Sequence, residues 1–159
     1  MKKTQKKLGN KGFSLVELIV VIAIMAVLVG VLAPTLIRNV EKSRESTDVQ
    51  NLDSMRGAVV TLLSNEKYYD ALVNSADTTY TVKFDGSATI TGWSDSNTAA
   101  TDDVKSKIQT ELYETVGNFK TKSKAADEKD IQFTISSLGK VSATFKNATP
   151  KYVDTFTIE

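Results

Sequence analysis

LIVVIAIMAVLVGVLAPTLI, residues 18–37, decides the fold because twenty residues pass here without a charge. A helix of that length, at ~1.5 Å per residue, spans the ~30 Å hydrocarbon core of a bilayer. The large aliphatic side chains together favour insertion by about 4 to 8 kcal/mol, which exceeds the cost of placing Glu17 at the membrane boundary. We therefore predict that the chain crosses a membrane once.

A polar segment, residues 1–12, precedes the apolar stretch. Five of the chain's twenty cations lie in it: Lys2, Lys3, Lys6, Lys7 and Lys11. Such a segment is typical of a targeting leader, and its positive charge keeps this end in the cytoplasm. Without those five lysines, fifteen cations face nineteen anions, so we predict no specific binding of nucleic acid through a basic field.

A cleaved secretory signal is the alternative interpretation of the apolar stretch, with Val31-Leu32-Ala33 as a small-residue cleavage site. Pro34 would follow that cut directly. The stretch is also longer than the ~7 to 15 residues that are usual in such signals. We therefore favour an apolar segment that stays in the mature protein.

The chain contains no Cys and no His, which removes the commonest nucleophile, general base and metal ligands. We accordingly predict no catalytic residues, no cofactor and no metal site, and a protein that is not an enzyme. Two acidic clusters, at residues 102–103 and 127–130, lack the spacing of a calcium-binding loop. They are interpreted as a solvated helix cap and a solvated loop.

The long helix is predicted to continue beyond the apolar stretch, from about Phe13 to Asn65. An apolar stripe follows this second part at spacings of three and four residues: Leu52, Met55, Val59 and Leu62. Gly57 costs the helix ~1 kcal/mol relative to Ala, which packing can offset. The helix is thus expected to be apolar on all sides in its first half and on one face in its second.

The remainder of the chain predicts β-structure with one short helix. Alternating patterns predict strands at residues 80–84, 88–93, 131–136, 140–146 and 152–158. Apolar residues four apart predict a helix at 102–116, with Thr101 as N-cap and Gly117 just beyond its end. The expected fold class is α+β, a small antiparallel sheet packed on the amphipathic half of the long helix.

The residues at the leader boundary are Lys11-Gly12-Phe13-Ser14-Leu15-Val16-Glu17. They resemble the class III signal of type IV prepilins, in which a basic leader ends in Gly, Phe follows, and Glu is the fifth residue of the mature chain. The resemblance covers residues 11 to about 37 and implies the pilin fold. It also implies that a prepilin peptidase cuts between Gly12 and Phe13 and methylates the new amine of Phe13.

Three segments follow from this resemblance. Residues 1–12 would be the cleaved leader, and 13–37 the transmembrane helix that later forms the filament core. Residues 38–159 would form the globular pilin head, which includes the second half of the long helix.

Glu17 is a carboxylate with only apolar neighbours, which is costly in lipid unless a partner neutralises it. After cleavage, the amine of Phe13 becomes that candidate partner, four residues away on the same helical face or in a neighbouring subunit. Two such charges ~4 Å apart attract by about 4 kcal/mol at an effective dielectric near 20, before desolvation is subtracted. Glu17 is thus predicted to set the register of assembly, whereas the alternative is a carboxylate left in headgroup water.

Gly30 and Pro34 weaken the same helical turn, because proline lacks the N–H that would bond to the carbonyl of residue 30. A simple bend is one interpretation of this pair. The family resemblance suggests that the segment from Gly30 to Pro34 unwinds when the subunit leaves the membrane for the filament.

The resemblance implies a structural subunit of a type IV pilus that serves adhesion, twitching motility or DNA uptake. A pseudopilin of a type II secretion or competence system is the alternative, while a single-pass enzyme or receptor lacks the residues for a catalytic site. The implied partners are other copies of the chain, prepilin peptidase, the pilus assembly platform, minor pilins and, before assembly, the membrane. The implied location is first the cytoplasmic membrane and then the cell surface.

Many pilins of Gram-negative bacteria close the head with a disulfide, which a chain without Cys cannot form. A Gram-positive source is therefore expected. We also expect the sheet alone to hold the C-terminal tail.

Overall fold

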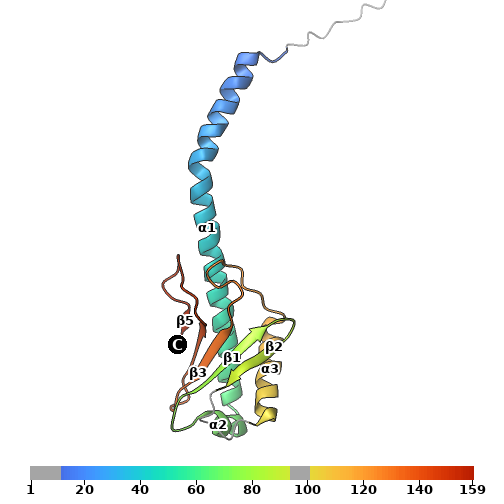
Figure 1. Ribbon diagram of the computed structural model, residues 1–159, viewed down its shortest axis with the longest axis vertical. Coiled ribbons are helices and arrows are strands. Elements are labelled where there is room, and N and C mark those ends of the chain that lie inside the picture. Colours follow the sequence, from blue (N-terminus) through green and yellow to red (C-terminus); the bar gives the residue numbers. More distant parts are fainter. Residues whose placement is uncertain (1–11, 94–100) are drawn as a thin grey trace, which may run out of the picture. The chain divides into compact units, whose positions relative to one another are not determined.

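The computed structural model describes residues 12–93 and 101–159 (Figure 1). The chain forms two compact units, of which one ends at Asn39 and the other runs from Val40 to Glu159. Helix α1, Leu15–Leu63, contributes to both. The predicted helix, from Phe13 to Asn65, is therefore confirmed to within two residues at each end.

In the unit that ends at Asn39, α1 is apolar and exposed on all sides. It is long and apolar enough to cross a membrane by length and composition, a test that a signal sequence near the N-terminus also passes. Pro34 lies inside the helix, which is unbroken from Gly30 to Pro34.

The unit that begins at Val40 combines the second part of α1 with two short helices and a five-stranded sheet. The further elements are α2 (Glu66–Leu72), β1 (Thr78–Phe84), β2 (Ala88–Trp93), α3 (Asp102–Val116), β3 (Ile131–Ile135), β4 (Val141–Phe145) and β5 (Thr157–Ile158). The strand order is β2-β1-β3-β4-β5, and every neighbouring pair is antiparallel. The predicted α+β class is thus confirmed.

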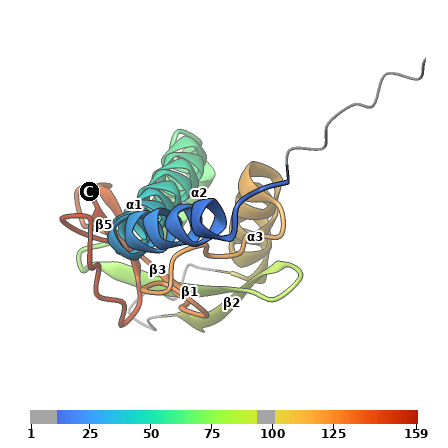
Figure 2. The same ribbon diagram turned by 90° about the horizontal axis from the view of Figure 1, so that it is seen from above.

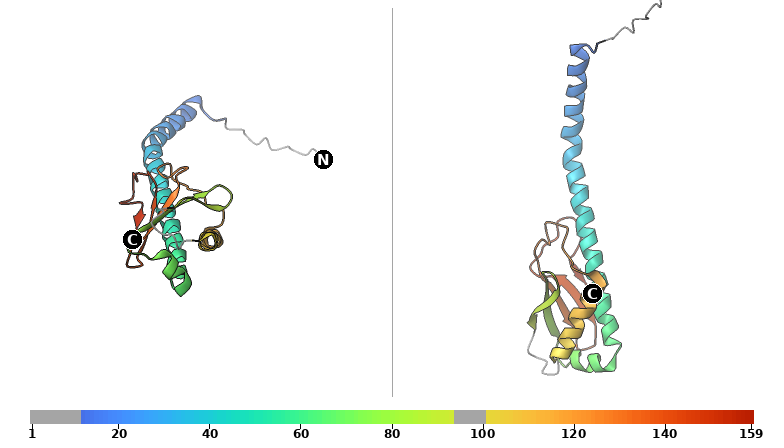
Figure 3. Two further views of the ribbon diagram at one scale, coloured as in Figure 1. Left: turned by 60° about the horizontal axis from the view of Figure 1, so that its bottom comes forward. Right: turned by 90° about the vertical axis from the view of Figure 1, so that its right-hand side faces the viewer.

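One face of the sheet, here called the inner face, packs against α1 and α3 (Figures 2 and 3). The predicted stripe of α1 lies in this core, since Leu52, Met55 and Val59 are fully buried. The sheet contributes the alternate, inward residues of its strands, among them Tyr80 and Phe133, whose rings stack 5.1 Å apart. Each such aliphatic or aromatic side chain contributes about 1.5 to 3 kcal/mol on burial.

Three acidic residues extend the buried stripe of α1 toward its N-terminal end at the same spacing: Glu41, Glu45 and Asp48. Glu45 and Asp48 are fully buried, and both accept hydrogen bonds from backbone N–H groups of loops. Apolar and acidic positions therefore share one face of the helix. The apolar positions pack on the sheet, and the acidic ones bind loops.

Asp48 binds the loop that follows α3. It accepts from the N–H of Lys122 at 2.9 Å, from the N–H of Ser123 at 2.8 Å and from the Ser123 hydroxyl at 2.6 Å. Glu41 accepts from the N–H of Lys124. The side chains of the lysines in this loop stay exposed, so the loop is fixed through its backbone.

Glu45 binds the C-terminal segment, through the N–H groups of Tyr152 at 2.7 Å, Val153 at 3.0 Å and Lys151 at 3.2 Å. These donors face a carboxylate instead of a neighbouring strand. The predicted strand at 152–158 is therefore wrong except at Thr157–Ile158. The expectation that the sheet alone holds the tail is also wrong.

The other predicted elements are confirmed, and one was missed. The hairpin at 80–93, the strands near 131 and 141 and the helix at 102–116 are all present. The missed element is α2, which begins after Asn65, whose side chain accepts from the N–H of Lys67 at 3.1 Å. Asparagine is a strong N-cap, so the sequence did carry a signal for this helix.

Candidate functional site

The start of α1 is fixed by Ser14. Its hydroxyl accepts from the N–H of Val16 at 3.3 Å, and its carbonyl accepts the first helical bond, from Leu18, at 3.2 Å. Gly12 and Phe13 precede the helix and are exposed. The peptide bond between them therefore lies outside regular structure, where a protease can bind it in an extended form.

Glu17 bonds back to this helix start, because its Oε2 accepts from the N–H of Ser14 at 2.9 Å. Ser14 and Glu17 together form a variant of the capping box, in which the Ser14 hydroxyl accepts from Val16 and the Glu17 carboxylate accepts from Ser14. This role was not predicted from the sequence. The signal was present, since Ser-x-x-Glu before an apolar stretch is the pattern of a capping box.

In the intact chain, Phe13 and Glu17 do not share a helical face. The reason is that Ser14 is the N-cap, so α1 begins at Leu15 and Phe13 lies outside it. In the intact chain the nitrogen of Phe13 also belongs to a peptide bond. Pairing of Glu17 with the amine of Phe13, within one subunit or between two, remains a prediction about the cleaved protein.

Gly12 lies in open space, because a Cβ added there would meet no atom within 4 Å. The fold of this chain therefore does not require glycine at this position. A requirement for a small residue must come from whatever binds the segment.

Gly30 and Pro34 lie within continuous helix, and a Cβ added at Gly30 would also meet nothing within 4 Å. The predicted unwinding concerns the assembled filament, and it stays a prediction. The same open surroundings apply to the whole apolar part of α1: Leu15 is 73% exposed, Leu28 54% and Ile37 68%.

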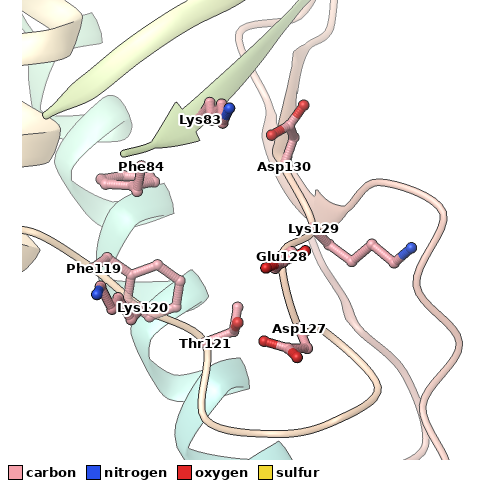
Figure 4. Close-up of a pocket in the computed structure, with 9 residues that line it drawn as sticks. All are labelled: Lys83, Phe84, Phe119, Lys120, Thr121, Asp127, Glu128, Lys129 and Asp130. Atoms are coloured by element: carbon pink, nitrogen blue, oxygen red, sulfur yellow. The ribbon is translucent and has the colours of Figure 1, made fainter. Parts of the chain in front are cut away.

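The acidic cluster at 127–130 borders a hollow in the head (Figure 4). The hollow is lined by Lys83, Phe84, Phe119, Lys120, Thr121, Asp127, Glu128, Lys129 and Asp130. Three lysines thus accompany the three acids, and Lys129 points away from the hollow in Figure 4. Across residues 12–93 and 101–159, no three side chains of His, Cys, Asp or Glu gather to hold a metal ion.

Residues 7–33 match the family described as the prokaryotic N-terminal methylation motif. The chain carries the class III signal of type IV pilins and pseudopilins. The match includes every predicted residue of the signal, from Gly12 and Phe13 to Glu17, together with Gly30. No curated protein and no solved structure matches the chain.

The class III signal supports a pilin-like or pseudopilin-like protein that is processed as a prepilin. The motif is structural rather than enzymatic, and it implies processing by prepilin peptidase and assembly with other pilin subunits. Together with the apolar helix, it indicates insertion into a membrane before assembly.

Proposed function

We propose that the chain is a structural subunit of a type IV pilus. Prepilin peptidase cleaves it between Gly12 and Phe13 and methylates the amine of Phe13. The subunit then leaves the cytoplasmic membrane and polymerises at the cell surface through the apolar part of α1. It acts as a building block and not as a catalyst.

One observation carries this proposal: the class III signal stands at the start of a helix whose apolar side chains are exposed all round. Exposed apolar surface costs about 25 cal/mol per Å² in water. In the precursor, lipid covers it. Outside the membrane, the same surface on identical copies is the natural cover, because each copy presents the same unsatisfied helix.

Glu17 has two roles in this proposal, at two stages. Before cleavage its carboxylate caps α1 through the N–H of Ser14. After cleavage it pairs with the amine of Phe13 of its own or a neighbouring subunit, which sets the register of addition. The carboxylate is needed for the second role, whereas an amide is sufficient for the first, because Gln at this position also completes a capping box.

Two variants separate these roles. Glu17→Gln keeps the cap but removes the charge, and Glu17→Ala removes both. We expect both to insert into the membrane, and both to weaken the addition of a subunit about tenfold, the equivalent of ~1.4 kcal/mol, and so to give fewer filaments than the parent chain. Filament yield is measured by sedimentation of sheared surface material and by electron microscopy.

Glu114→Gln is the matched control, since Glu114 is an exposed acid on α3. It should assemble normally. Normal assembly of Glu17→Gln combined with poor assembly of Glu17→Ala would reject the pairing role and leave only the cap. Correct cleavage with no long fibres from the parent chain would instead indicate the pseudopilin alternative.

A further inference from the structure

The face of the sheet that points away from α1 and α3 is lined by hydroxyl and amide side chains. This outer face includes Thr79, Gln132, Thr134, Ser142, Thr144 and Thr157, which alternate with the buried residues of their strands. Figures 2 and 3 show the helices on the opposite side of the sheet.

These side chains form two rows across the strands. Thr134 of β3 lies opposite Thr79 of β1 and Ser142 of β4. In the next row, Thr144 lies opposite Gln132 and Thr157. Neighbouring strands are ~4.8 Å apart and successive outward residues ~6.8 Å apart, so the polar groups form a regularly spaced array.

The members of this array on β3, β4 and β5 have free hydrogen-bonding capacity. Thr157 donates to the hydroxyl of Thr144 at 3.1 Å, which leaves both oxygens able to accept again. Gln132, Thr134 and Ser142 make no side-chain hydrogen bond to any residue that the structure describes. Their donors and acceptors therefore face solvent or a partner.

The outer face is also nearly uncharged. A quarter of the chain's residues are charged. Among the outward positions of the described strands, however, only Lys83, near the end of β1, is charged. Threonine suits exposed strands, which accounts for its presence. The centres of protein–protein interfaces are likewise depleted of charged residues.

We propose that the outer face binds a neutral, polyhydroxylated polymer, that is, a surface polysaccharide. Hydroxyl groups both donate and accept, so a hydroxyl array matches a hydroxyl-rich partner without fixed polarity. The lack of charge fits a neutral partner and disfavours nucleic acid or anionic lipid, which require cations. The inference rests on the proposed function, because a filament repeats the face many times and multiplies weak contacts.

The test is binding of the full-length chain, in detergent, to particles of crystalline cellulose and of chitin, which are neutral polysaccharides. The test variant Thr134→Lys/Ser142→Glu places opposite charges on facing residues, so that a cross-strand pair supports the fold. The control variant Ser106→Lys/Thr110→Glu places the same charges four residues apart on the exposed side of α3.

We expect the parent chain and the control to bind at least one of the two polymers equally at low and high salt. The test variant should bind about tenfold more weakly, because charged side chains replace two of the hydroxyl groups that would contact the polymer. Its thermal unfolding should match that of the control. A second variant, Thr134→Val, should weaken binding without adding charge.

Three results would overturn the proposal: no binding by the parent chain, equal binding by the test variant, or binding that disappears in high salt. Loss of filaments in the test variant, with binding unchanged, would assign the face to contacts between copies and also overturn it. Because binding is measured on unassembled chain, failure of the proposed pilus function shows separately, as an absence of filaments from the parent chain.

Discussion

Two buried carboxylates of α1, Glu45 and Asp48, hold distant loops to this helix by hydrogen bonds. Each receives at least three hydrogen bonds from loop groups, and no cation pairs with either among residues 12–93 and 101–159. The N–H dipoles of the two loops therefore offset the cost of burying the charges. The loop after α3 and the C-terminal segment are held to the same helix in this way.

Asp48→Asn should lower the free energy of unfolding by about 1 to 3 kcal/mol, because the amide presents one acceptor oxygen and an NH₂ group to donors. Glu45→Gln should do the same and loosen the C-terminal segment first. Denaturant unfolding of the full chain measures the first effect, and hydrogen exchange at residues 151–153 measures the second.

Asp53→Asn is the matched control for these variants, since Asp53 is exposed on the same helix and pairs with Arg56 at 2.9 Å. It should change stability by no more than about 1 kcal/mol. Equal effects of Asp48→Asn and Asp53→Asn would contradict the assigned role of the buried carboxylates.

Tyr80 is fully buried, and its hydroxyl makes no hydrogen bond within the described residues. Tyr80→Phe should therefore leave stability unchanged or raise it by up to about 1 kcal/mol at neutral pH. Burial raises the pKa of Tyr80 well above its ordinary value of 10.0. Above pH ~10 the unfolded chain loses this proton while the folded chain keeps it, so stability falls as pH rises.

Thermal unfolding between neutral and alkaline pH checks both statements on Tyr80. The parent chain should lose more stability above pH ~10 than Tyr80→Phe does. Parallel loss in both proteins would show that the Tyr80 hydroxyl does not titrate on unfolding.

Single residues of the processing signal could be predicted from sequence because cleavage signals are read as local sequence. Gly12, Phe13 and Glu17 were found in this way, and the family match covers them. Ser14-x-x-Glu17 also indicates the capping role of Glu17, although its apolar neighbours favoured charge neutralisation as the interpretation. The loop partners of Glu45 and Asp48 lie 74 to 108 residues away in sequence, so no local pattern indicates them.

At the scale of elements, α1 contains both a proline and a glycine in one turn and yet is continuous. Proline in a helix interior costs ~3 kcal/mol, so this turn is the part of the helix that opens with least loss of stability. We expect a density map of the filament to show the backbone from Gly30 to Pro34 unwound.

The variant Gly30→Ala/Pro34→Ala should keep this segment helical in the filament, because alanine restores both the N–H and the helix propensity. It should also assemble in lower yield if unwinding is needed for packing. Continuous helix at 30–34 in filaments of the parent chain would contradict the proposed unwinding.

Elements with strong local signals could be predicted well. α3 has the predicted bounds, because Thr101, Gly117 and the apolar spacing mark its limits, although Thr101 makes no side-chain cap. α2 is only seven residues long, so its apolar pattern is too short to predict a helix. β5 is shorter than predicted, because the N–H groups before it bond to Glu45 instead of a neighbouring strand. Boundaries set by long-range contacts are what the sequence could not predict.

At the scale of the whole molecule, the α+β class followed from one apolar helix and a set of alternating strands. The order of strands in the sheet could not be predicted, because β1 pairs with β3, and β2 and α3 lie between these two strands in the sequence. The outer face likewise became visible only when register placed Thr134 opposite Thr79 and Ser142.

In our proposal, cleavage and an exposed apolar helix turn this chain into a filament subunit. Mass spectrometry of the N-terminal peptide, on fibres sheared from cells, tests this proposal. We expect a peptide that begins at Phe13 and carries one N-methyl group. Fibres whose subunits begin at Met1, or chain that is found only as single copies, would contradict it.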